Sequence, residues 1–199
     1  MKGMTAVFLC AVLASTNVAV AQQEIVTLKA AIVALTDDER LRAEFEDSLA
    51  ALARENNYDA VASYRIVADV DDVERRRFAR DLREAGIGAV LMMRPAAIGQ
   101  GSSLAAVRDA VSPQVYTNMR DFAGEVSPSA GDDLVAVVHL GIYLLNADGP
   151  ELLSAGAVWL DEAAGSQQES IDRLQNLVLA NVDAVRGPIR QHLGLPPLE

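Results

Sequence analysis

The chain has 199 residues, of which 51% are hydrophobic and 23% are charged, a balance that is typical of a globular protein and excludes a disordered one. Its formal net charge of −11 argues against nucleic-acid binding, because proteins that bind phosphate backbones rely on lysine and arginine to release counterions. The single cysteine, Cys10, lies near the start of the chain, so the rest of it offers no disulfide, thiol nucleophile or thiolate metal ligand.

Residues 1–21 have the pattern of a signal peptide. Lys2 supplies a positive charge, Met4 to Ser15 form an apolar run, and Ala19-Val20-Ala21 before Gln22 is a small-x-small cleavage pattern. The apolar run is too short for a spanning helix, which needs about 20 residues. We therefore expect cleavage at Ala21/Gln22 and a mature chain, 22–199, that is periplasmic or secreted, has no transmembrane segment and forms a single α/β domain.

The next part of the chain alternates β-favouring apolar runs with amphipathic helical segments. The expected strands are 28–35, 58–67 and 87–93, with Pro95 stopping the third. The first helix is expected to begin at a capping box in which Thr36 and Glu39 bond to each other's backbone amides. The second is expected to run from Asp71 to Gly86. This order of elements is typical of a parallel sheet with helices packed against it.

Residues 96–133 are predicted to be a partly irregular insert, with a helix that is capped by Ser112 and has Met119 and Phe122 on its apolar face. The apolar runs 134–145 and 152–160 flank the turn residues 146–150 and predict an antiparallel hairpin. A second capping box, Ser166 to Glu169, begins a long C-terminal helix with a bend at Gly187-Pro188. The chain thus predicts a mixed sheet of about five strands, β-α-β-α-β and then a hairpin, packed by helices.

The second expected helix is rich in arginine. Arg76 and Arg80 belong to a group of five arginines that is interleaved with acidic residues. One interpretation is a contact for an acidic partner or an anionic envelope polymer. The other is a solvated face with helical ion pairs, each worth about 0.3–0.5 kcal/mol.

A face of the predicted sheet is a second candidate binding surface. Tyr64, Arg94, His139 and Tyr143 would contribute to it if helices cover only the other face, and aromatic and arginine side chains are typical interface anchors. The alternative is that residues 96–133 fold over this face and bury it. His139 has no acid or nucleophile near it in sequence, which favours a structural histidine over a catalytic one. No catalytic group, metal site or cofactor is therefore assigned.

Three short motifs carry a resemblance: Arg42-Ala-Glu-Phe45-Glu46, Ser63-Tyr64 and Gly86-Ile-Gly88-Ala89-Val90-Leu91. With this order of elements, the chain resembles small uncharacterised bacterial periplasmic and envelope proteins, often lipoproteins, whose fold is similar to the amino-terminal domain of the Tol translocation protein. The resemblance implies an accessory of an envelope assembly. Membrane anchoring is not carried over, because the mature chain lacks the cysteine that bears the lipid in many of these proteins.

Two functional hypotheses follow. The first is an exported, non-enzymatic accessory or interaction protein of the bacterial cell envelope, whose partner is an envelope protein or assembly. The second is a periplasmic small-ligand-binding protein or hydrolase with a site near the 96–133 segment and the ends of the parallel strands, where α/β sheets usually bind ligands.

Overall fold

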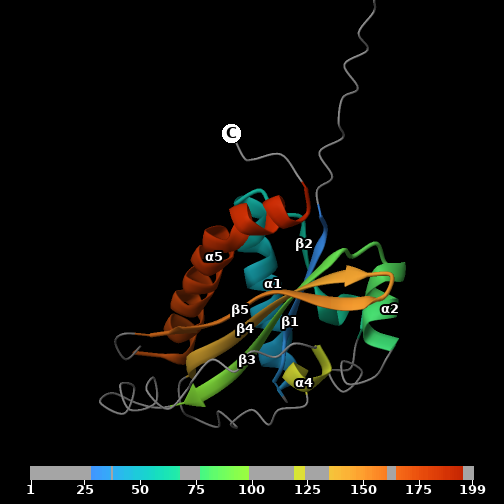
Figure 1. The fold of residues 1–199 in the computed structure, drawn as a ribbon. Helices are drawn as coiled ribbons and strands as arrows, with labels where there is room; N and C mark the ends of the chain where they lie inside the picture. The colour runs from blue at the N-terminus through green and yellow to red at the C-terminus, as the bar shows by residue number, and fades with distance from the viewer. Residues whose placement is uncertain are drawn as a thin grey trace, which may run out of the picture.

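A computed structural model of the chain describes residues 28–36, 38–67, 77–98, 119–123, 135–160 and 165–194. It confirms the predicted α/β class, with a mixed sheet of five strands and helices on both of its faces (Figure 1). In chain order, the elements are β1 (Ala30–Ala34), α1 (Glu39–Glu55), β2 (Ala60–Ala62), the 3-10 turn η1 (Ser63–Arg65), α2 (Arg77–Glu84), β3 (Ala89–Ile98), α4 (Met119–Ala123), β4 (Val135–Asn146), β5 (Gly149–Trp159) and α5 (Gln167–His192).

The strands lie in the order β2-β1-β3-β4-β5. β1 is parallel to both β2 and β3, whereas β3 pairs antiparallel with β4 and β4 antiparallel with β5, so the predicted parallel strands followed by a hairpin are confirmed. β2 pairs with β1 only as far as Ala62, which lies opposite Ile32, and the chain then turns into η1. Among the described residues, this early end of β2 leaves the last residues of β1 without a strand neighbour on that side.

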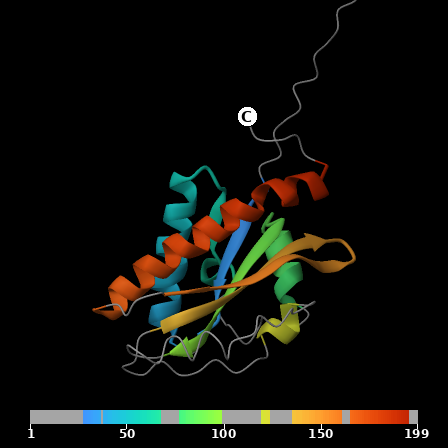
Figure 2. The same ribbon diagram turned by 60° about the vertical axis from the view of Figure 1, so that its left-hand side comes forward.

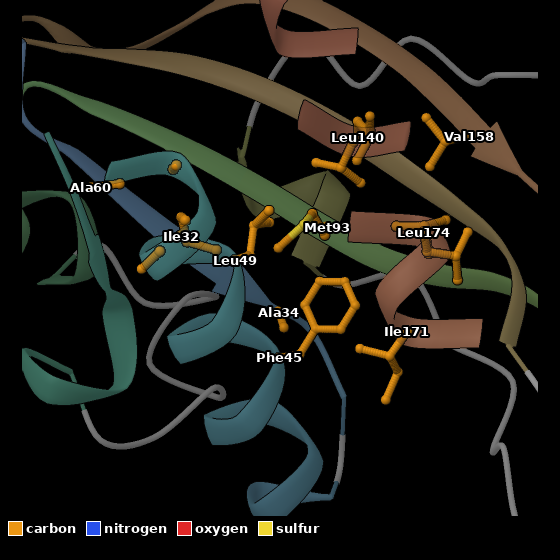
Figure 3. Packing of buried hydrophobic residues seen from close by; sticks show 14 of the residues in the cluster. Ile32, Ala34, Phe45, Leu49, Ala60, Met93, Leu140, Val158, Ile171 and Leu174 are labelled. Carbon is orange, nitrogen blue, oxygen red and sulfur yellow. The ribbon is translucent and has the colours of Figure 1, made fainter. Parts of the chain in front are cut away.

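Two apolar cores lie on the two faces of the sheet. α1 and α5 pack on one face, and Figure 3 shows Phe45 and Leu49 of α1 and Leu174 of α5 meeting over Ile32 and Met93 of the sheet. Figures 1 and 2 show α1 and α5 on the same side of the sheet. The opposite core contains residues of α2, α4 and the sheet: Phe78, Leu82, Val90, Met92, Met119, Phe122, Tyr143 and Leu145 are among its members.

Three local predictions were wrong. The expected strand 58–67 is much shorter, because β2 covers only Ala60–Ala62 and Ser63–Arg65 form the 3-10 turn η1. The N-cap of α1 is Asp38 rather than Thr36: its Oδ1 accepts hydrogen bonds of 3.0 Å from the amides of Arg40 and Leu41. Aspartate caps a helix at least as well as threonine, and the helix therefore begins at Glu39. Pro95 does not end β3, which continues to Ile98. Because β1 ends at Ala34, this part of β3 pairs only with β4 among the described strands, and a proline is tolerated where a strand has a neighbour on one side alone.

The C-terminal half of the prediction agrees well with the structure. Asn146 pairs with Gly149, so the hairpin closes with the two-residue turn Ala147-Asp148, and Gly149, which follows the turn, has a φ of +131°. The hydroxyl of Ser166 accepts a hydrogen bond from the amide of Glu169, as the second capping box predicts. Pro188 lies inside α5, and Figure 1 shows this helix changing direction toward its C-terminal end. Of the insert 96–133, the predicted cap at Ser112 lies outside the described residues.

Candidate functional site

Arg94 and His139 form a buried polar contact between β3 and β4. The two residues are register partners, and Nη2 of Arg94 lies 3.1 Å from Nδ1 of His139. A guanidinium only donates hydrogen bonds, so Nδ1 of His139 is the acceptor in this contact. The side chain of Arg94 also lies over the ring of Phe122 in α4, 5.8 Å from its centroid. Arg94 and His139 are only 4% and 7% exposed.

Tyr143 lies on the same face, further along β4. Its ring folds back over Gly141, where an added Cβ would be 2.7 Å from Cε2, and it meets Phe122 edge-on at 6.4 Å. Burial, and to a smaller extent the negative charge of Asp121, raises the pKa of the Tyr143 phenol. The structure thus brings Arg94, His139 and Tyr143 together, but beneath α4, which belongs to the 96–133 segment.

Tyr64 is not part of this cluster. It lies in η1, where its hydroxyl donates a hydrogen bond of 2.6 Å to Asp47 of α1. Arg65 holds the same carboxylate at 2.8 Å. Desolvation raises the pKa of Asp47, but the hydrogen bonds from Tyr64 and Arg65 and the positive charges of Arg65 and Arg54 together lower it below its usual value. The four side chains predicted for one sheet face therefore belong to two separate groups.

The described part of the arginine-rich helix carries local ion pairs. Arg80 lies 3.1 Å from Asp81 and 3.6 Å from Glu84, and its side chain is 55% exposed. Arg83 donates to the carbonyl oxygens of Asn146 and Ala147, which connects α2 to the β4–β5 turn. Arg76, the other arginine predicted to bind a partner, lies outside the described residues.

A second buried polar group, which sequence reasoning missed, consists of Arg42, Glu46 and Ser63. Arg42 and Glu46 form a fully buried ion pair one turn apart on α1, with Nε 3.0 Å from Oε1. The Ser63 hydroxyl donates to both oxygens of Glu46 at 3.0 Å and accepts from Arg42 Nη2 at 3.1 Å. Arg42 Nη2 also donates to the carbonyl oxygen of Val67.

Glu46 replaces the strand neighbour that β1 loses where β2 ends. Its carboxylate accepts hydrogen bonds of 2.9 Å from the amides of Ala34, at the end of β1, and Tyr64, in η1. A buried amide without an acceptor is strongly unfavourable, so this carboxylate stabilises the point where β1, α1 and η1 meet. The sequence does carry a signal for it: Arg42 and Glu46 lie in line with Ala50 and Ala53, which are both buried small residues.

β5 is an edge strand of the described sheet, and a groove lies beside it. β5 is the last strand of the sheet, and a groove of about 240 Å³ separates its first half from the C-terminal part of α5. The groove is lined mostly by apolar side chains: Leu152, Leu153, Ser154, Val185, Pro188, Ile189 and His192. His192 Nε2 lies 3.2 Å from the Glu151 carboxylate, so this contact joins α5 to β5. A second, wholly apolar pocket of about 30 Å³ lies between the N-terminal ends of α1 and α5.

Comparison with protein-family models, with curated proteins and with solved structures found no match to this chain. Within the described ranges, histidine, cysteine, aspartate and glutamate side chains form no group of three or more that could hold a metal ion. None of the helices described by the structure combines the length and apolar character that crossing a bilayer requires.

Proposed function

We propose that this chain is an exported, non-enzymatic accessory or interaction protein of the bacterial cell envelope. The signal-peptide pattern of residues 1–21 supports export, with cleavage at Ala21/Gln22 and a periplasmic or secreted mature chain. The resemblance to small envelope proteins supports the same compartment. The observation that carries the interaction role is the edge of β5, which has no further strand beside it in the described part of the chain and lies next to a largely apolar groove, a combination that suits recognition of an extended partner segment.

The buried polar groups favour a structural role over a reactive one. Glu46 is held by Arg42, Ser63 and two backbone amides, and Arg94 is held between His139 and Phe122. Each group joins a helix to the sheet. A rigid domain of this kind is suited to presenting a surface to a larger assembly.

Affinity capture from cross-linked envelope tests this proposal. The full chain is produced with a C-terminal tag, and its partners are identified by mass spectrometry, which also shows whether the mature chain begins at Gln22. A reproducible stoichiometric envelope partner is expected. Capture of the protein alone, under conditions where a known envelope complex cross-links efficiently, would contradict the interaction role. Changing Arg76→Glu and Arg80→Glu together shows whether the arginine helix contributes.

A second candidate is a periplasmic small-ligand-binding protein or hydrolase with its site near the 96–133 segment. The contact between Arg94 and His139 favours it, because a guanidinium beside an imidazole suits an anionic ligand and α4, which covers them, belongs to that segment. Thermal shift with inorganic phosphate and small carboxylates tests this candidate. Stabilisation that His139→Gln removes would support it, whereas equal stabilisation of both proteins would count against it.

A further inference from the structure

A β-bulge in β5 forms one wall of the groove beside α5. Leu152 and Ser154 pair with consecutive residues of β4, so Leu153 between them is an extra residue. Bulges turn side chains in directions that a regular strand does not allow, and here three consecutive residues, Leu152 to Ser154, line the same groove. The bulge also interrupts the ladder of backbone hydrogen bonds, and Pro150, near the start of the strand, has no N–H. The first half of β5 is therefore a poor template for an added peptide strand.

The opposite wall of the groove is a face of α5 that carries Val185, Ile189 and His192. Pro188 lies on the same face inside the helix, where its missing N–H and its ring bend the helix. Earlier in α5, Val178 is fully buried, whereas Val185 and Ile189 are only half-buried. The groove of about 240 Å³ therefore lies where both the strand and the helix depart from regular structure.

The two ends of this groove differ in polarity. At the inner end, helix and strand are in close contact, because a Cβ on Gly156 would lie 3.8 Å from the side-chain nitrogen of Asn181. At the outer end, Nε2 of His192 lies 3.2 Å from Oε1 of Glu151, whose other oxygen accepts a hydrogen bond of 2.6 Å from Asn146. The side chains of His192 and Glu151 are 57% and 45% exposed. The groove is thus an apolar space that leads to a hydrated polar pair.

The size of the groove and the charges around it select the occupant. Its volume is slightly below the about 300 Å³ of the smallest typical ligand pockets, so it suits one alkyl chain and not the two chains of a bilayer lipid. From Glu151 to Ser154 the strand advances by about 10 Å, the length of an alkyl chain of roughly eight carbons. Both oxygens of Glu151 and Nε2 of His192 are already engaged, so an uncharged head group suits this end better than an ion.

A second copy of the chain is a less suitable occupant. Asp148 and Glu151 are exposed at the outer end of the groove. A second chain bound along the groove would add a further net charge of −11 beside these acidic side chains, and like charges oppose association.

From this groove, we propose that the chain binds one free, uncharged amphiphile with a single medium-length alkyl chain between β5 and the C-terminal part of α5. The alkyl chain lies along Leu153, Val185 and Ile189, and the polar head lies at Glu151 and His192. This site goes beyond the proposed interaction role, and it does not use the regular part of β5 from Ala155 to Trp159.

Isothermal titration calorimetry of the purified mature chain with monoacylglycerols tests this proposal, at concentrations where the ligands stay monomeric. One molecule of monooctanoylglycerol is expected to bind per chain. Monobutanoylglycerol, which is four methylenes shorter, should bind about 100-fold more weakly, because each buried methylene changes the affinity about fourfold. Monododecanoylglycerol should gain no more than about threefold over monooctanoylglycerol, since its extra carbons extend beyond the groove. Octanoate, which has a carboxylate head, should bind about tenfold more weakly than monooctanoylglycerol.

A matched pair of variants and a filled groove locate the site. Leu153→Gln puts an amide into the groove and should weaken binding of monooctanoylglycerol about tenfold. Leu177→Gln makes the same change at a leucine of α5 that is 39% exposed and outside the groove, so binding should stay within about twofold of wild type. Ser154→Phe fills the groove with an apolar ring and should abolish binding, which keeps the test decisive where Leu153→Gln unfolds the domain. Circular dichroism shows which variants are folded.

Three results would overturn the proposal: no binding of monomeric monooctanoylglycerol, an affinity that rises by the same factor per methylene up to the dodecanoyl chain, or equal losses in Leu153→Gln and Leu177→Gln. A dimer that Ser154→Phe dissociates in sedimentation experiments would overturn it in favour of a second copy. Loss of a cross-linked envelope partner in Ser154→Phe, without binding of monooctanoylglycerol, would assign the groove to that partner and leave the proposed function standing.

Discussion

Replacement of Glu46 by glutamine is expected to be among the most damaging small changes to this fold. The substitution keeps the shape of the side chain but removes its charge and turns one acceptor oxygen into a donor. At present, the two oxygens accept from Arg42 Nε, from the Ser63 hydroxyl and from the amides of Ala34 and Tyr64. The two backbone amides donate to different oxygens of Glu46. Because glutamine has a single side-chain oxygen, its NH2 group would face the N–H of Ala34 or of Tyr64, and two donors would oppose each other.

The magnitude follows from the burial of the pair. The side chains of Arg42 and Glu46 are 3% and 0% exposed, so Arg42 would keep a buried charge without its carboxylate. Removing one partner of a buried ion pair typically costs about 3–5 kcal/mol. The expected loss is a large part of a total folding free energy of about 5–15 kcal/mol. Arg42→Met should cost less, because Glu46 keeps three hydrogen-bond donors: Ser63 and the two amides.

Urea unfolding of the purified mature chain, followed by circular dichroism, measures these differences. Arg173→Met is the matched control, because Arg173 and Glu169 have the same i, i+4 spacing on α5 but their side chains are 36% and 51% exposed and lie 3.8 Å apart. This control should change the free energy of unfolding by less than about 0.5 kcal/mol. A Glu46→Gln protein within about 1 kcal/mol of wild type, or no more affected than the control, would refute the role assigned to Glu46.

Two further predictions concern Asp47 and Gly141, the glycine of β4. The folded pKa of Asp47 lies below its ordinary value of 3.8, so its contribution to stability is present above that pH and is lost as the pH falls through the folded value. The difference in unfolding free energy between wild type and Asp47→Asn should therefore shrink from neutral pH to about pH 2.5; a constant difference would contradict it. Gly141→Ala should destabilise by about 1–3 kcal/mol, because its Cβ would meet the Tyr143 ring at 2.7 Å. Gly156→Ala, with 3.8 Å to Asn181, should change the unfolding free energy by less than about 0.5 kcal/mol in the same thermal or urea experiment.

Periodicity and turn chemistry were enough to predict the architecture. The spacing of Phe45 and Leu49 identified the buried face of α1, and the Asn146–Pro150 turn identified the β4–β5 hairpin. These signals are local, since they depend on residues a few positions apart. The errors at Thr36 and Pro95 were local as well, but each was decided by a neighbour: Asp38 competes for the cap, and β1 ends before Pro95.

The surroundings of Arg94 and His139 could not be read from the sequence in the same way. The residues are 45 positions apart, and their contact depends on the register between β3 and β4. Whether their face of the sheet was open or covered depended on the insert, which has weak secondary-structure signals. The structure decides this point for the described residues, because Phe122 lies against both Arg94 and Tyr143.

Two short motifs of the sequence, Arg42-Ala-Glu-Phe45-Glu46 and Ser63-Tyr64, acquire a physical explanation from the buried group around Glu46. Arg42 and Glu46 come from the first motif and Ser63 and Tyr64 from the second, and the structure joins all four through hydrogen bonds. An acidic side chain is needed here because β2 ends early and leaves the Ala34 amide without a strand partner. These residues stabilise the β1-α1-β2 unit with its short edge strand, so they explain the fold and do not indicate a reaction. Function in such a chain must therefore be sought on its open surfaces, of which β5 is the longest strand edge described.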